Sequence, residues 1–313
     1  MNRKFATVII FLFLFSTSLF AQDYSSSDKA NKQALRDYEN GQYRAAIMGF
    51  TTVIKLTSSL RPPKRAYRLD ASRGGISSVD LPDYGGITVL DPRTAVAYVN
   101  RGKAYLNVGD TDSAIDDFGR AILIAPAMIA AFQCRGVAEL TTKRFEAAEK
   151  DFEKVIKLVP KGIDGYIGRG GARLRLGHVK AAFDDFDRAV ALDPKSPIAF
   201  YHRGEALRET GNVLASLPDY DKAIQLDPKM VDVYISRSMV HFELDQFDLA
   251  FSDADQAVKL DPGSALAYGN RGLALLAQQK LPEARKDLLR ALELDPSLKP
   301  HIDKNLKLID AHK

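Results

Sequence analysis

The stretch GYIGRGGARLRLG, residues 165–177, holds five glycines and three arginines in thirteen positions. Such a stretch is typical either of a loop that binds a phosphate or of glycines that let two helices pack closely. A packing role in a repetitive chain predicts that the same residue types recur at a fixed interval on either side.

The same residue types recur along this chain at one constant spacing, which equals the sequence distance from Gly136 to Gly170. The recurring positions are a glycine (with one serine), an aromatic residue and a proline: Gly102, Gly136, Gly170, Gly204, Ser238 and Gly272; Tyr98, Phe132, Tyr166, Phe200, Tyr234 and Tyr268; Pro126, Pro160, Pro194, Pro228, Pro262 and Pro296. Six consecutive units follow, namely 95–128, 129–162, 163–196, 197–230, 231–264 and 265–298.

Each unit is predicted to form two helices. In the first unit Tyr98, Gly102 and Tyr105 are spaced i, i+4, i+7 on one stripe, and a second stripe follows the turn at Gly109. The closing proline ends the second helix, because proline cannot donate to the helical ladder and restricts its predecessor. A single helix pair cannot bury its apolar face, so neighbouring pairs must stack.

The units resemble tetratricopeptide repeats (TPRs), whose aromatic, glycine, alanine and proline positions match residue by residue over 95–298. The resemblance implies an all-α fold, a right-handed superhelical solenoid of helix-turn-helix repeats. Residues 27–60 resemble a degenerate repeat in which Ala34 replaces the glycine. Residues 299–313 are expected to form a C-terminal capping helix.

The register places the glycines of the opening stretch in a helix. Gly170 is the helix-crossing glycine, and Gly177 belongs to the turn between helices. The segment follows no strand and lacks the Lys-Ser/Thr ending of a phosphate-binding loop, which argues against nucleotide binding. Gly165, Gly168 and Gly171 are extra to the repeat, and they predict either a locally soft helix or a bare patch where a ligand backbone approaches.

A second regularity pairs charges within each unit. An arginine precedes each glycine slot, and an aspartate follows that arginine by sixteen residues: Arg101 and Asp117, Arg135 and Asp151, Arg169 and Asp185, Arg203 and Asp219, Arg237 and Asp253, Arg271 and Asp287. The planar guanidinium can meet a carboxylate in two parallel hydrogen bonds. The sequence therefore predicts a structural arginine–aspartate ladder between helices, with six independent surface charges as the alternative.

The TPR resemblance implies that the first helix of each pair lines a concave groove that binds a peptide or protein. The candidate groove residues are Asn100, Lys103, Gln133, Val137, Ile167, Gly168, Gly171, Arg175, Tyr201, His202, Glu205, Glu209, Ile235, Met239 and Asn270. Family members that grip C-terminal carboxylates use several lysines, arginines and asparagines, and only Asn100 and Lys103 match part of that clamp.

Residues 61–94 interrupt the array and are predicted to be an irregular insertion, since they contain two Gly-Gly pairs, several prolines and no sustained helical stripe. Long structureless connections are uncommon in compact domains and tend to be functional or disordered. A decayed repeat is the alternative, because the segment is as long as one repeat unit. Its basic first part either docks on an acidic partner or membrane surface, or stays solvated.

The N-terminus predicts a secretory signal peptide over residues 1–21. Arg3 and Lys4 precede an uncharged run at 5–20, and Ala21 suits a cleavage site. The expected location is exported, in a bacterial periplasm or secreted; the alternative is an uncleaved anchor holding a subunit of an envelope complex. Cleavage would lower the formal net charge from +4 to +2 by removing two basic residues, which disfavours nucleic acid as a partner.

Nothing in the sequence matches a catalytic or cofactor motif. The only cysteine is Cys134, and the five histidines lack metal-ligand spacing. His202, Glu205 and Glu209 offer a less favoured metal-dependent site. We therefore expect a non-catalytic protein-interaction scaffold with no cofactor, no bound metal and, after signal cleavage, no membrane span.

Overall fold

The structure of the chain is a computed structural model that describes residues 19–58, 65–70, 75–80 and 92–311. The chain divides into two compact units, Met1–Ala147 and Ala148–Lys313. The predicted signal peptide lies outside the described residues, except for its last three positions, which begin the first helix.

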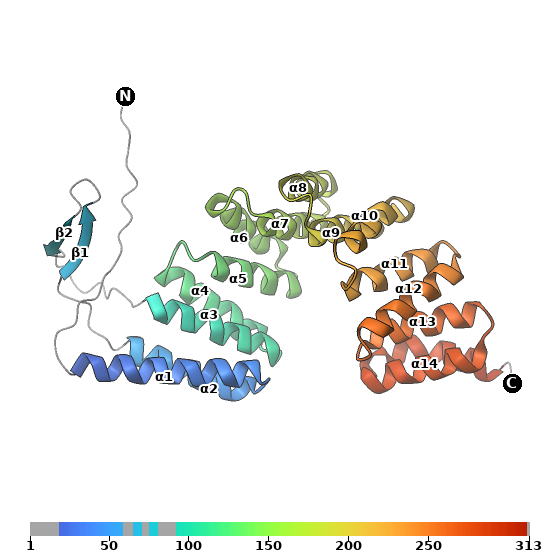
Figure 1. Cartoon of the computed structure of the whole chain (residues 1–313), viewed down its shortest axis with the longest axis horizontal. Helices are drawn as coiled ribbons and strands as arrows, with labels where there is room; N and C mark the ends of the chain where they lie inside the picture. The colour runs from blue at the N-terminus through green and yellow to red at the C-terminus, as the bar shows by residue number, and fades with distance from the viewer. Residues whose placement is uncertain (1–18, 59–64, 71–74, 81–91, 312–313) are drawn as a thin grey trace, which may run out of the picture. The chain divides into compact units, whose positions relative to one another are not determined.

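Helix pairs build the first unit (Figure 1). Its helices are α1 (Leu19–Glu39), α2 (Tyr43–Ser58), α3 (Pro92–Asn107), α4 (Thr111–Ile124) and α5 (Ile129–Thr141), followed by the start of α6 (Phe145–Leu158). α1 packs on α2 and α3 on α4, while α2 and α3 join one pair to the next. Ala34, Ala46 and Phe50 are fully buried between α1 and α2, at the position of the degenerate repeat.

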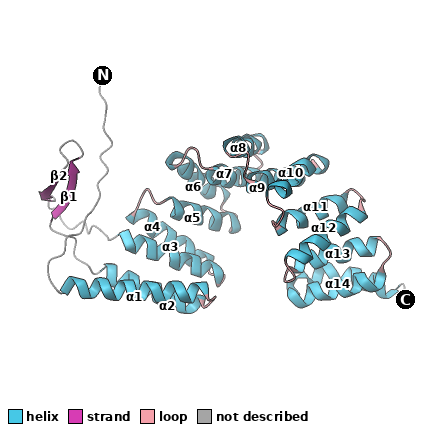
Figure 2. Cartoon of the chain, viewed as in Figure 1, coloured by secondary structure: helices cyan, strands magenta, loops and turns pink. Residues whose placement is uncertain are grey.

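Two strands lie in the segment predicted to be irregular: β1 (Arg65–Asp70) and β2 (Gly75–Asp80). They form an antiparallel pair in which Arg65 lies opposite Asp80 and Asp70 opposite Gly75 (Figure 2). Extended strands at these positions differ from the helices that a decayed repeat would supply. The rest of the insertion before α3 lies outside the described residues.

The second unit continues the pattern. It holds the remainder of α6, then α7 (Ile163–Arg175), α8 (Val179–Leu192), α9 (Pro197–Glu209), α10 (Val213–Leu226), α11 (Val231–Glu243), α12 (Phe247–Leu260), α13 (Ala265–Ala277), α14 (Leu281–Leu294), the 3-10 turn η1 (Pro296–Leu298) and α15 (Lys299–Ala311). The odd-numbered helices α7, α9, α11 and α13 also pack in succession. α15 covers the last pair, since Ile302 and Ile309 are buried with Leu275 and Leu288.

The recurring glycine sets the distance between paired helices. A Cβ built on Gly102 would lie 2.6 Å from the ring of Phe118, sixteen residues later on the partner helix. A Cβ on Gly204 would lie 3.0 Å from the ring of Tyr220, a less severe but still tight contact. Phe118 and Tyr220 are fully buried, so the absent glycine side chain is the space that the ring fills.

The turn inside each pair needs a left-handed backbone. Gly109, Gly177 and Gly211 have φ between 78° and 83°, as expected where the last helical carbonyls are capped by a left-handed residue. The all-α fold class of stacked helix pairs is thus confirmed, and the described strands are confined to residues 65–80.

Candidate functional site

The arginine–aspartate ladder is present in both units. Five pairs each make two parallel hydrogen bonds of 2.6–3.0 Å, from the arginine Nε and Nη2 to the two carboxylate oxygens: Arg101–Asp117, Arg169–Asp185, Arg203–Asp219, Arg237–Asp253 and Arg271–Asp287. These five aspartate side chains are at most 8% exposed. Arg135 and Asp151 lie in different units, and their pairing stays a prediction.

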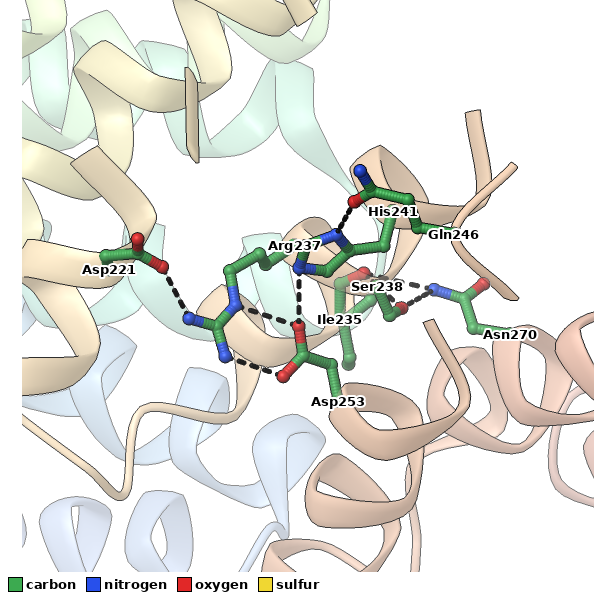
Figure 3. A network of polar contacts seen from close by, with 8 residues as sticks. All are labelled: Asp221, Ile235, Arg237, Ser238, His241, Gln246, Asp253 and Asn270. Carbon is green, nitrogen blue, oxygen red and sulfur yellow. Dashed lines mark hydrogen bonds and ion pairs between the residues drawn. The ribbon is translucent and has the colours of Figure 1, made fainter. Parts of the chain in front are cut away.

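The ladder also links successive repeats, which the sequence reasoning missed. The third nitrogen, Nη1, donates to an aspartate of the preceding repeat: Arg203 to Asp187 at 2.8 Å, Arg237 to Asp221 at 2.6 Å and Arg271 to Asp255 at 2.7 Å. Figure 3 shows the Arg237 fork between its two aspartates. Part of the signal was available, since Asp187, Asp221 and Asp255 recur at the repeat interval, whereas Gly119, Glu153 and Leu289 hold the equivalent position in the other repeats.

Aromatic rings complete each rung. The Arg203 guanidinium carbon lies 5.7 Å from the ring centroid of Phe200, and that of Arg271 lies 5.3 Å from the ring of Tyr268. The hydrogen bond to Asp219 raises the pKa of Arg203 above its ordinary value, against the opposing effect of burial. The ladder therefore stays charged, and its side chains are committed to holding helices together.

Four candidate groove residues belong to the first unit. Asn100 and Lys103 lie on α3, and Gln133 and Val137 lie on α5, which packs against α3. Val137 is 50% exposed, whereas the other three are half-buried. The two helices thus bring one basic, two amide-bearing and one apolar side chain onto adjacent elements.

Two of the three extra glycines of α7, Gly165 and Gly168, have a packing role. A Cβ on Gly168 would lie 2.3 Å from the ring of Phe152 on α6, and one on Gly165 would lie 2.7 Å from Ile156. Gly168 is therefore closed off by a neighbouring helix and offers no bare patch to a ligand. A Cβ on Gly171 would meet nothing within 4 Å.

The other two candidates on α7 differ in exposure. Ile167 is half-buried, whereas Arg175 is exposed and pairs with Glu209 of α9 at 3.0 Å. This ion pair joins the first helices of two successive repeats.

The carboxylates of α9 are already engaged. Glu205 accepts a hydrogen bond from the buried Tyr220 hydroxyl at 2.5 Å and one from Arg208 at 3.3 Å. Burial lowers the pKa of His202, and Glu205 partly offsets that effect. Burial has the opposite effect on Tyr201, because it raises the pKa of the phenol. The Tyr201 ring lies 5.2 Å from that of His202.

The metal-site alternative needed His202, Glu205 and Glu209 to converge. Instead the two glutamates serve different arginines, and in the part of the chain that the structure describes no group of three His, Cys, Asp or Glu residues is placed to hold a metal.

A pocket of about 130 Å³ lies between α11 and α13. It is lined by Ser238, Met239, Phe242, Glu243, Asn270 and Leu273, which include two of the predicted groove residues. Asn270 reaches from α13 to α11, where its Nδ2 donates to the Ile235 carbonyl at 3.1 Å and to the Ser238 Oγ at 2.9 Å (Figure 3).

The pocket differs from the predicted groove in two respects. The Ile235 side chain is only 9% exposed and belongs to the core with Ala267, so its carbonyl faces Asn270 while its side chain is unavailable to a ligand. Ser238 and Phe242 were not predicted. The break in the glycine series at Ser238 was the one signal in the sequence.

Stacked helix pairs with a crossing glycine and a closing proline define a helical repeat protein. Models of the tetratricopeptide repeat family match residues 95–128, 167–231 and 237–298, together more than half of the chain. The chain therefore belongs to the tetratricopeptide repeat family.

Solved structures share this fold. A tetratricopeptide repeat protein from Parabacteroides merdae superposes with a TM-score of 0.64 at 18% identity, covering 91% of this chain and 99% of that one. The Cut9-Hcn1 hetero-tetramer of APC/C superposes with a TM-score of 0.60 at 17% identity, covering 69% of this chain and 42% of that one. The structure of pilF from Pseudomonas aeruginosa superposes with a TM-score of 0.53 at 16% identity, covering 70% of this chain and 97% of that one. At these identities the likeness concerns the fold alone. No curated protein matches the chain in sequence.

Proposed function

We propose that this chain is a non-catalytic scaffold that holds a peptide or protein segment against the inner helices α9, α11 and α13. The observation that carries the proposal is the pocket between α11 and α13, because it lies between first helices of adjacent repeats, where the resemblance to TPRs implied a binding groove. A site shared by two repeats can recognise a segment that runs along the stack.

The surface around the pocket has the character of a binding site. Met239 is 37% exposed although it is large and apolar, and Phe242 and Leu273 line the same pocket. Polar groups with free hydrogen-bonding capacity stand beside these apolar side chains. A few convergent polar groups in an apolar pocket are typical of a site that orients its ligand.

We further propose that the protein is exported. The proposal rests on the basic start, the uncharged run at 5–20 and the small residue at Ala21. No helix among the described residues has the length and apolarity to cross a bilayer. Measuring the mass of the protein recovered from its source cells tests cleavage, and a mass that retains residues 1–21 would contradict it.

A paired substitution tests the binding surface. We expect Met239→Glu to reduce recovery of crosslinked partners at least about tenfold, because it places a charge in the apolar pocket. Leu249→Glu is the matched control, since Leu249 is 51% exposed on α12 and does not line this pocket. Equal recovery by both variants and the unmodified chain would show that partners bind elsewhere.

A further inference from the structure

The hydrogen-bond donors and acceptors that line the pocket differ in whether they already have partners within the protein. The Asn270 Nδ2 carries two hydrogens and gives them to the Ile235 carbonyl and to Ser238 Oγ. The Ser238 hydroxyl donates to the Ile235 carbonyl at 2.7 Å. These bonds fix the amide orientation, because the Ile235 carbonyl can only accept. The hydrogen-bond donors that line the pocket are therefore already used.

Two hydrogen-bond acceptor groups of the pocket, the Asn270 amide oxygen and the Glu243 carboxylate, are available to a ligand. Among the described residues no hydrogen bond reaches Asn270 Oδ1. The Glu243 side chain is 40% exposed, and its nearest cation is the Arg208 Nη1, 3.6 Å from Oε1. A distance of 3.6 Å is too long for a hydrogen bond. A ligand can thus donate to the amide oxygen and to the carboxylate.

The charge around the pocket is negative. Arg208 is shared between Glu205 at 3.3 Å and Glu243 at 3.6 Å, so two carboxylates face one guanidinium. Arg271, the cation nearest to Asn270 along α13, is committed to two aspartates of the ladder. One negative charge is left uncompensated beside the apolar walls of the pocket.

We propose that the pocket takes a lysine side chain of the bound segment, an inference that rests on the proposed function. A lysine has an apolar stem to lie along Met239, Phe242 and Leu273, and an ammonium group with three donors and no acceptor. Leucine in the same place would leave the two acceptors buried without partners. Arginine holds its five donors in a fixed plane, whereas the lysine ammonium can rotate its three donors toward both acceptor groups.

Peptide selection on the purified full-length chain tests the inference. A random peptide library displayed on phage is selected on the chain, and binders that persist on the Met239→Glu variant are discarded. We expect lysine to be enriched at one position of the remaining peptides. Synthetic copies with that lysine replaced by norleucine, which keeps the stem and loses the ammonium, should bind at least about tenfold more weakly in calorimetry.

Glu243→Gln removes the negative charge but keeps an acceptor oxygen, so it should reduce the difference between lysine and norleucine peptides from about tenfold to about threefold or less. Its matched control is Glu283→Gln on α14, an exposed glutamate that does not line this pocket and should preserve the difference. Thermal unfolding of both variants checks that each is folded.

The outcomes separate the two proposals. Selected peptides without a lysine preference, or with norleucine copies that bind as well as lysine copies, overturn the lysine pocket and leave the scaffold function standing. If no selected peptide loses binding on the Met239→Glu variant, the proposed binding groove is wrong. The lysine pocket is then overturned as well, because it is part of that groove.

Discussion

At the scale of single residues, the ladder arginines illustrate how one side chain can serve two helices and two repeats. From Arg203 onward, each ladder guanidinium uses three nitrogens on two aspartates, one of them buried and the other more exposed. The buried partner lies on the second helix of the same repeat, and the more exposed partner lies on the second helix of the repeat before.

The two partners of Arg203 should contribute very differently to stability. We expect Asp219→Asn to lower the free energy of unfolding by about 3 kcal/mol, since it leaves a partly buried guanidinium with only the exposed Asp187 as a charge partner. Asp187→Asn should cost less than about 1 kcal/mol, because the Asp187 side chain is 63% exposed and its charge is screened. Urea denaturation measures both, and equal losses would mean that burial does not set the strength of the ladder.

Sequence spacing was sufficient to pair these residues. The interval of sixteen between Arg203 and Asp219 recurs in every complete unit. Spacing alone did not distinguish the buried aspartate from the exposed one, because exposure depends on how deeply the second helix sits under its neighbours.

At the scale of elements, helix α7 shows that glycine can have opposite roles on one helix. Gly168 and Gly170 face rings on two different neighbours, Phe152 and Phe186, while Gly171 faces open space. The repeat register explained Gly170, since it falls in the recurring slot. It could not explain Gly168, because the close approach of α6 is not part of the repeating pattern.

Substituting two of these glycines should change stability in opposite directions. Gly168→Ala would force a Cβ to within 2.3 Å of the Phe152 ring, and we expect it to destabilise the protein by about 1–3 kcal/mol. Gly171→Ala should stabilise it by about 0.5–1 kcal/mol, because alanine loses less backbone freedom in a helix and meets no neighbour within 4 Å. Thermal unfolding of the two variants measures both effects; a stabilised Gly168→Ala protein would contradict the packing role.

At the scale of the whole molecule, stability is a sum of contacts between neighbours. α15 buries Ile302 and Ile309 against the final repeat and presents a mostly polar outer surface, as terminal elements of repeat arrays do, although Leu308 is exposed there. Local losses in such an array should stay local, because each pair contacts only the pairs beside it.

Weakening the cap should therefore loosen only the end of the chain. The double substitution of Ile302→Ala and Ile309→Ala removes two buried side chains, at an expected cost of about 2–5 kcal/mol each. Hydrogen exchange should lose protection in α13, α14 and α15, while α3 and α4 keep theirs. A uniform loss across both units would mean that the chain unfolds as one cooperative body.

The sequence by itself determined the repeating architecture, from the constant repeat interval, the crossing glycines and the paired charges of the ladder. These features recur because every repeat meets the next through the same few contacts, so local pattern is enough to specify them. Tertiary structure alone decided the surroundings of the candidate site. It buried Ile235, closed Gly168 under Phe152 and left Glu243 and Asn270 with spare acceptors. These side chains break the repeat, and their surroundings are set by unlike residues on adjacent helices.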